Sequence, residues 1–274
     1  MGLDREFGIT RFHSWFAALL FMSMFLSVPQ SACATAIASS NIALFSFQIT
    51  PKEGTLQLFG SWAGEAFAQA SNSLGQLAST FDSTVGNFAL ADTVGVSFAE
   101  GHGLASALVL GVTATASSNV NIPGTTTTTQ ASSVGLGTLF NSFIITGGIG
   151  SVDVAFSVHI AGAQHVVTDK FGLRARTTTI FDLELNGTPI LFHDSIDDIG
   201  PNFEITSGFD QTLSTTLNLQ FFTPYFLLGQ VDSESFGLNV PGPGTITLVL
   251  TGLGVFVGFA GRRITREKTY ALKS

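Results

Sequence analysis

Apolar and polar residues alternate one by one through several segments of this 274-residue chain, and this alternation strongly constrains the fold. In residues 151–160 the even positions hold Val, Val, Phe, Val and Ile, whereas the odd positions are small or polar. Residues 45–50 and 213–221 show the same alternation. Because successive side chains of a β-strand point to opposite faces, this pattern predicts strands with one buried and one solvated face. No segment between the two ends of the chain sustains a helical period of 3.6 residues.

The clearest hairpin signal is Asn186-Gly187, which separates the runs at residues 180–185 and 189–192. Asn-Gly favours the positive φ angles of a type I′ turn, so we expect two antiparallel strands joined here. Clusters of Gly, Asn, Asp and Ser predict further turns near residues 60, 101, 121, 147, 162, 200, 208 and 229. Many short strands with such turn signals are typical of a sandwich or barrel. We expect an all-β fold, an antiparallel β-sandwich that is jelly-roll-like.

Two segments depart from the strand pattern. Residues 61–80 are rich in Ala, Gln, Ser and Leu, and we expect a short helix or a loop there. Residues 117–133 contain a Pro-Gly pair and a run of five threonines, which favours a loop or an edge strand. On the alternating faces, six apolar residues are expected to be buried: Val154, Phe156, Val158, Leu183, Leu217 and Leu219.

The N-terminal 36 residues have the pattern of a secretory signal peptide. A mildly basic start precedes an apolar run at residues 15–28, and Pro29 interrupts that run. Ala34 and Ala36 supply the small residues that a signal peptidase requires. We therefore expect residues 1–36 to be removed after Ala36, with cleavage after Ala34 as the alternative.

The C-terminal end has three parts in a fixed order. Two prolines in residues 240–244 form a rigid break, because proline continues neither a strand nor the interior of a helix. Residues 245–261 are uncharged, and a helix from Gly244 to Gly261 rises ~27 Å at about 1.5 Å per residue, just short of the ~30 Å hydrocarbon core. Arg262 and Arg263 are then expected to hold the far end of a transmembrane helix on the cytoplasmic side.

This tail, residues 240–274, resembles the PEP-CTERM sorting signal of exopolysaccharide-producing bacteria. Gly242 stands where the family usually has Glu, and the residues that match the family pattern are Val240, Pro241, Pro243, the Gly-Leu-Gly at 252–254, Arg262 and Arg263. The resemblance implies insertion in the inner membrane, cleavage near the proline motif by an exosortase, and release to the cell surface or matrix. It implies nothing direct about the domain that precedes the tail. An ordinary C-terminal membrane anchor is the alternative interpretation.

Between the leader and the tail, residues 37–239 are expected to form one exported, acidic domain. Its four cationic residues stand against sixteen carboxylates, which gives a net charge of about −12. Such a surface repels nucleic acid and anionic lipid, so nucleic acid is excluded as a partner. The only cysteine, Cys33, lies in the leader, so the mature domain forms no disulfide and depends on its core for stability.

One cluster of carboxylates is a candidate metal site. Asp194, Asp197 and Asp198 lie in a segment that ends at Gly200, and we expect this segment to be a loop. Calcium takes oxygen ligands from flexible loops of this kind. The segment matches no dedicated calcium motif, so solvated turn residues are the alternative interpretation.

Other catalytic or metal-binding patterns are weak. The sequence contains no Gly-x-Ser-x-Gly elbow, no His-Glu-x-x-His and no Walker or Rossmann glycine pattern. Four histidines follow the leader, and they would form a zinc site only if their strands meet: His102, His159, His165 and His193. Scattered surface histidines are the alternative. Any two of the sixteen acids can be paired on paper as a glycosidase, so that pattern decides nothing.

These features indicate where the protein goes more clearly than what it does. The leading hypothesis is a non-enzymatic protein of the cell envelope or extracellular matrix, structural or adhesive, and associated with exopolysaccharide or biofilm. The expected partners are the membrane, an exosortase-like processing enzyme and exopolysaccharide. The alternatives are a carbohydrate-binding module that holds exopolysaccharide and a secreted hydrolase with an unrecognised site.

Overall fold

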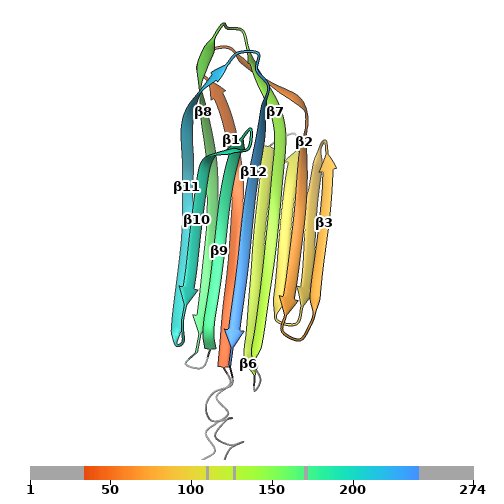
Figure 1. Cartoon of the computed structure of the whole chain (residues 1–274), viewed down its shortest axis with the longest axis vertical. Helices are drawn as coiled ribbons and strands as arrows, with labels where there is room; N and C mark the ends of the chain where they lie inside the picture. Colours follow the sequence, from red (N-terminus) through yellow and green to blue (C-terminus); the bar gives the residue numbers. More distant parts are fainter. Residues whose placement is uncertain (1–33, 109–110, 126–127, 170–171, 241–274) are drawn as a thin grey trace, which may run out of the picture. The chain divides into compact units, whose positions relative to one another are not determined.

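The computed structural model describes residues 34–240, except residues 109–110, 126–127 and 170–171 (Figure 1). These residues form twelve strands in two six-stranded sheets, and every neighbouring pair of strands is antiparallel. The expected all-β, antiparallel sandwich is thereby confirmed. The described residues contain no helix that is long and apolar enough to cross a membrane. The expected transmembrane helix at residues 245–261 and nearly all of the expected signal peptide lie outside the described residues.

The two sheets are built from strands of nine to eighteen residues. Sheet A has the order β11-β8-β1-β6-β5-β4 and comprises β1 (Ala34–Pro51), β4 (Phe88–Val96), β5 (Ala99–Leu108), β6 (Gly111–Thr125), β8 (Ser151–Thr168) and β11 (Phe203–Gln220). Sheet B has the order β10-β9-β12-β7-β2-β3 and comprises β2 (Thr55–Asn72), β3 (Leu77–Val85), β7 (Thr129–Thr146), β9 (Gly172–Leu185), β10 (Thr188–Ile199) and β12 (Tyr225–Asn239). Strands consecutive in sequence share a sheet only at β2–β3, β4–β5–β6 and β9–β10.

The predicted hairpin at Asn186-Gly187 is confirmed. It joins β9 to β10, and both turn residues have positive φ angles, 51° at Asn186 and 75° at Gly187. A type I′ turn requires positive φ at both central positions, and Asn and Gly tolerate that conformation best. Here a local signal in the sequence determines the local backbone.

Six of the predicted turns are wrong. The glycine-containing clusters near residues 147 and 200 do lie between strands, but those near 60, 101, 121, 162, 208 and 229 lie inside strands. At two of these positions glycine is needed for close approach. A Cβ atom added to Gly101 would lie 2.3 Å from the carbonyl oxygen of Val134, and one added to Gly162 would lie 2.4 Å from the ring of Phe209. These two glycines make room for tertiary contacts and do not turn the chain.

The two segments that departed from the strand pattern are strands as well. Apart from the turn at residues 73–76, residues 61–80 belong to β2 and β3, so the expected helix is wrong and a loop is confined to that turn. Most of residues 117–133 belongs to β6 and β7. Both are central strands, because β6 lies between β1 and β5 while β7 lies between β12 and β2. Alanine, serine and glycine at these positions pack between closely spaced sheets, a role that local propensity does not reveal.

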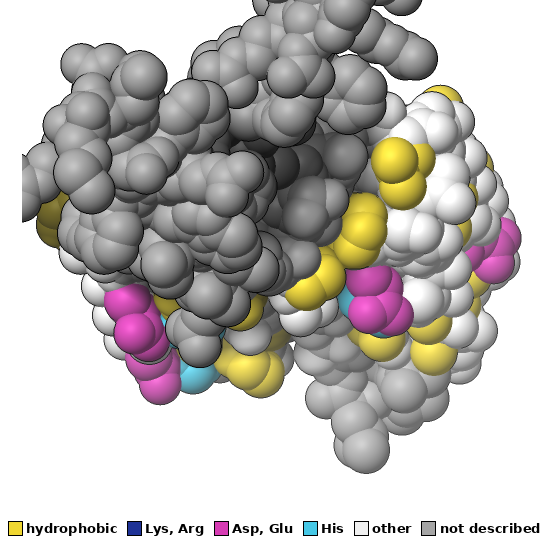
Figure 2. Space-filling view, turned by 90° about the horizontal axis from the view of Figure 1, so that it is seen from below, with side chains coloured by type: hydrophobic (Ala, Val, Ile, Leu, Met, Phe, Trp, Pro, Cys, Tyr) yellow, Lys and Arg dark blue, Asp and Glu magenta, His cyan; other side chains and the backbone are white. Residues whose placement is uncertain are grey.

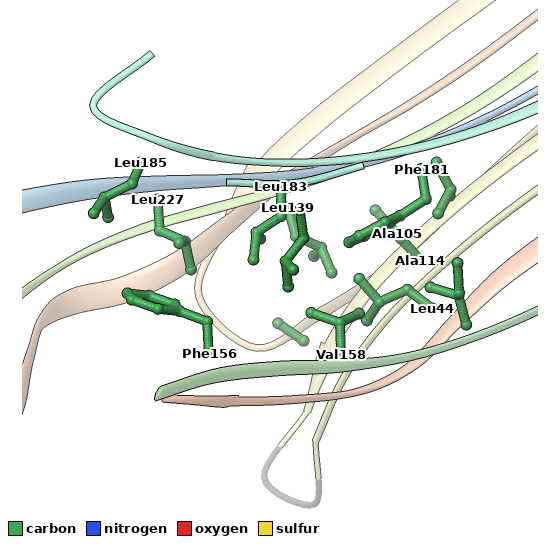
Figure 3. Packing of buried hydrophobic residues seen from close by; sticks show 14 of the residues in the cluster. Leu44, Ala105, Ala114, Leu139, Phe156, Val158, Phe181, Leu183, Leu185 and Leu227 are labelled. Carbon is green, nitrogen blue, oxygen red and sulfur yellow. The ribbon is translucent and has the colours of Figure 1, made fainter. Parts of the chain in front are cut away.

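The larger hydrophobic core lies between the two sheets (Figure 3). Most of its residues come from β8, β1 and β6 of sheet A and from β9, β12 and β7 of sheet B. Figure 3 shows Phe156 and Val158 on one side facing Leu183, Leu185 and Leu227 on the other. Five of the six residues expected to be buried are buried; Leu217, on the edge strand β11, is only partly buried. Residues 34–240 thus form a compact unit with a core of its own.

A network of buried serines separates this core from a second, smaller cluster that contains Ala38, Val120 and Ile122. The serines come from both sheets, and the distances between their Oγ atoms are 2.6 Å for Ser40 and Ser233 and 2.8 Å for Ser118 and Ser235. Because each hydroxyl has a partner in the opposite sheet, burial leaves none of these groups unsatisfied. The network therefore links the two sheets with hydrogen bonds in the middle of the sandwich.

Candidate functional site

The three aspartates of the candidate calcium site lie on β10, so the expectation of a loop is wrong. Asp197 and Asp198 are adjacent and point to opposite sides of the strand. Asp197 accepts a hydrogen bond from Ser207 in the opposite sheet. Asp198 is bound by the Arg174 guanidinium, whose Nε lies 2.8 Å from Oδ1, and this bond holds the pKa of Asp198 below its usual value.

The described residues therefore do not bring Asp194, Asp197 and Asp198 together. Within residues 34–240 as described, no group of three or more His, Cys, Asp or Glu side chains is placed to hold a metal ion. The calcium hypothesis stays a prediction.

Three of the four histidines lie on the outer face of sheet A, each beside a carboxylate. The Nε2 atoms of His102, His159 and His165 lie 3.3 Å from Glu100, 2.6 Å from Asp210 and 3.2 Å from Glu204, respectively. His193 instead faces the interior from β10. Its Nδ1 atom lies 2.7 Å from Gln211, its ring packs on Phe209, and burial lowers its pKa. The strands of the four histidines therefore do not form one zinc site.

A shallow groove of about 450 Å³ crosses the outer face of sheet A. Five strands contribute to it, and its lining side chains include Ser39, Asn41, Glu100, His102, Ser117, Asn119, His165 and Thr206. We call this feature the sheet A groove. The register of the sheet explains its shape, because His102, Ser117, Asn41, Ala163 and Gly208 follow one another in a row across the strands. Ala163 and Gly208, the small residues at one end of this row, leave room beside the imidazole of His102 and the amide of Asn41.

Several polar groups of the sheet A groove are held in place by neighbours. The Nδ1 atom of His102 lies 2.8 Å from the Thr93 hydroxyl, while its Nε2 atom faces Glu100. The Asn41 side-chain oxygen accepts a hydrogen bond of 3.2 Å from the Ala163 backbone. Imidazole, amide and hydroxyl groups both donate and accept hydrogen bonds, so this array can bind a polyhydroxylated molecule. The lining contains no Phe, Tyr or Trp ring on which a sugar could stack.

Sheet B carries a second hollow on its outer face. The hollow, of about 400 Å³, is lined by residues that include Arg174, Arg176 and Glu234. Next to it, burial and the nearby Glu234 raise the pKa of Asp232 to about 6. Asp232 therefore exchanges its proton close to neutral pH, unlike an ordinary surface aspartate.

The acidic character expected from the sequence is visible at one end of the sandwich. Figure 2 views the end at which β1 begins, and in its coloured part Asp and Glu side chains lie among apolar ones. Lysine and arginine side chains of the described residues are not in view on that part. An anionic ligand would meet repulsion there.

Sequence reasoning did not identify the residues of the sheet A groove as a group. The sequence signal for these residues was the alternating pattern of their strands, which places Ser39, Ser117, Asn119 and Thr206 on a polar face. Their neighbourhood depends on the register of strands that are far apart in the chain. Comparisons of the chain with protein-family models, with curated proteins and with solved structures gave no match.

Proposed function

We propose that this chain is an exported, non-enzymatic protein of the cell envelope or extracellular matrix, in which the β-sandwich has a structural or adhesive role. The observation that carries the proposal is where the sandwich begins and ends. A Cβ atom added to Gly237, near the end of β12, would lie 3.2 Å from Ile122 Cδ1. The neighbouring Asn121 pairs with Ile37, the expected first residue of the mature chain, near the start of β1. The chain therefore enters and leaves the sandwich at the same end, as Figure 1 also shows.

This arrangement suits a domain tethered at one end. The turns between β1 and β2, between β7 and β8, and between β11 and β12 lie at the other end of the strands. Strands of 18 residues extend ~60 Å at about 3.3 Å per residue, so a tether after β12 would present these turns far from its attachment point. We also propose that the strands of the sandwich are connected in a jelly-roll-like order.

The tail supplies the sorting step of the proposal. Its likeness to PEP-CTERM signals supports insertion in the inner membrane, processing by an exosortase-like enzyme near Pro241 and Pro243, and delivery to the cell surface or matrix. Exopolysaccharide is the proposed partner there. The excess of carboxylates supports an outward location away from nucleic acid.

Charge reversal after the apolar segment tests the sorting step. Arg262→Glu with Arg263→Glu should impair membrane retention, because the positive charges that hold the cytoplasmic end are lost. Arg262→Lys with Arg263→Lys keeps the charge and should keep retention. Fractionation of cells into membrane and medium measures the retention of both variants. Equal retention of the two would contradict the proposed role of Arg262 and Arg263 in holding the helix in the membrane. The mass of the surface form shows whether the chain is cut near residues 240–244.

Glycan binding is a second candidate function, and the sheet A groove is the observation that favours it. Removing one hydrogen-bonding group typically changes a free energy by ~0.5–1.5 kcal/mol, so Asn119→Ala or His165→Ala should weaken binding about two- to tenfold. Ser132→Ala, in the hollow on sheet B, is the control. Binding of residues 34–240 to a glycan array, followed by titration of the best glycan, measures the effect. An equal loss of glycan affinity in all three variants would show that the sheet A groove is not the binding site.

A further inference from the structure

The outer edge of β11 is a long strand edge with no partner among the described strands. β11 pairs with β8 over all 18 of its residues without a shift in register. It is the last strand of sheet A on this side. Its free edge therefore presents unpaired N–H and C=O groups along ~60 Å of backbone, which is a template for another strand.

The other edges of the sandwich carry features that discourage pairing. β3 and β4 are short, with nine residues each. β10 contains Pro189 and a register shift between Pro189 and Leu191. The part of β2 that extends beyond β3 contains a shift between Phe59 and Ala63. Short length, proline and bulges are the usual protections of edge strands, and β11 has no proline, no bulge and no Lys or Arg.

We propose that the edge of β11 docks a second copy of this chain, with the two β11 strands antiparallel about a two-fold axis at Gln211. Sheet A then continues from one copy into the other. A symmetric dimer requires a surface that is complementary to itself. The sequence of β11 meets this requirement, because its pattern of polar and apolar residues reads the same in both directions from Gln211.

The symmetry of β11 is clearest on the face that points into the sandwich. About Gln211, Phe209 lies opposite Leu213, Ser207 opposite Thr215, Ile205 opposite Leu217 and Phe203 opposite Leu219, so apolar residues meet apolar ones and polar residues meet polar ones. Phe203 and Ile205 are exposed in the single chain, at 62% and 38%, and pairing would bring them against apolar side chains. Cross-strand pairs of this kind stabilise antiparallel sheets.

The charges of β11 are compatible with the same register. β11 contains two charged residues, both carboxylates, Glu204 and Asp210. On the outer face the two-fold axis places Asp210 opposite Thr212 and Glu204 opposite Asn218, so no carboxylate meets another. This matters because the domain as a whole is strongly acidic and like charges directly opposite each other are destabilising.

Substitution of Thr212 tests the register. Thr212→Lys places a lysine opposite Asp210 twice per dimer and should tighten the dimer about two- to thirtyfold, whereas Thr212→Asp should weaken it by a similar factor. Asn121→Lys and Asn121→Asp change the net charge equally at an exposed position on the central strand β6 of the same sheet. Sedimentation equilibrium of residues 34–240 measures the dissociation constants. A monomer at all concentrations, or equal shifts at the two positions, would overturn the proposal.

Cross-linking checks the same register without relying on charge. Residues 34–240 contain no cysteine, since the single one is Cys33. Thr206 and Thr216 lie opposite each other in the proposed dimer, at the ~4.5–5.5 Å Cα separation that a disulfide accepts. When a Thr206→Cys chain is mixed with a Thr216→Cys chain, oxidation should join one of each. Predominant joining of like chains, or none above that of an Asn121→Cys control, would refute the pairing.

Discussion

Replacing Gly135 with alanine should strongly destabilise the sandwich, because the two sheets touch there through their backbones. Gly135 on β7 faces His102 on β5 and Ser117 on β6. A Cβ atom at Gly135 would lie 1.9 Å from the carbonyl oxygen of His102 and 2.5 Å from that of Ser117. Real Cβ atoms essentially never lie closer than 3.0 Å to such an atom, so the sheets must separate locally by roughly 1 Å or more.

The size of the effect follows from what can move. Both obstructing atoms are backbone carbonyls of central strands in sheet A, so no side chain can rotate away. Overpacking of a well-packed interior costs about 1–3 kcal/mol, and we expect the upper end of that range. Alanine also lowers the entropy of the unfolded chain, which offsets ~0.4–1 kcal/mol. The net loss of about 2 kcal/mol corresponds to a Tm lower by ~4–8 °C for a domain of this size.

Gly229→Ala is the matched control for this experiment. A Cβ atom at Gly229 would meet its nearest neighbour, Leu183 Cδ1, at 3.6 Å, an ordinary contact. Gly229 also borders a small apolar void of about 10 Å³. This variant should keep or slightly raise the Tm. Thermal unfolding of both variants in residues 34–240 measures the difference, and a Gly135→Ala Tm within 2 °C of the Gly229→Ala value would refute the reasoning, since about 4 °C or more is expected.

Three further predictions concern charge and burial. The pKa of Asp232 in the folded domain, about 6, exceeds its unfolded value of 3.8, so the folded state binds more protons between these values and stability falls as pH rises through this window. Asp232→Asn should reduce this pH-dependent decrease in the free energy of unfolding by up to ~3 kcal/mol. Urea unfolding at pH 4 and pH 7 measures the decrease. Val154→Asp should lower the free energy of unfolding by more than ~3 kcal/mol and Leu217→Asp by clearly less, because only Val154 is fully buried. Equal losses of stability in the two variants would contradict this. The calcium hypothesis predicts that millimolar calcium raises the Tm and that Asp197→Asn with Asp198→Asn removes most of the rise. The two carboxylates point to opposite sides of β10. An equal rise with sodium chloride at matched ionic strength, which is screening, or no rise with either salt would therefore refute a site at these residues.

Local patterns in the sequence identified the parts of the fold that depend on neighbouring residues. The alternation in residues 151–160 predicted the buried side of β8, and Val154, Phe156 and Val158 are buried there. Asn186-Gly187 predicted the turn between β9 and β10. In both cases the physical cause lies within a few residues, in side-chain period and in φ preference.

The same reasoning failed where a residue's role depends on a distant strand. Gly101 and Gly162 were interpreted as turn residues, but the carbonyl of Val134 and the ring of Phe209 require their lack of a side chain. Asp197 and Asp198 were interpreted as loop ligands, but on β10 they point to opposite sides.

The sequence by itself determined the class of structure, because a period of two can be satisfied only by strands with two different faces. It also carries the acidic composition and the tail pattern on which the proposed export depends. The tertiary structure decided the order and register of the strands, and with them the sheet A groove, the serine network and the unprotected edge of β11. These features bring together residues such as Ser40 and Ser233, which lie 193 positions apart. A local pattern shows which face a residue occupies, but only the packing of the whole chain selects its neighbours.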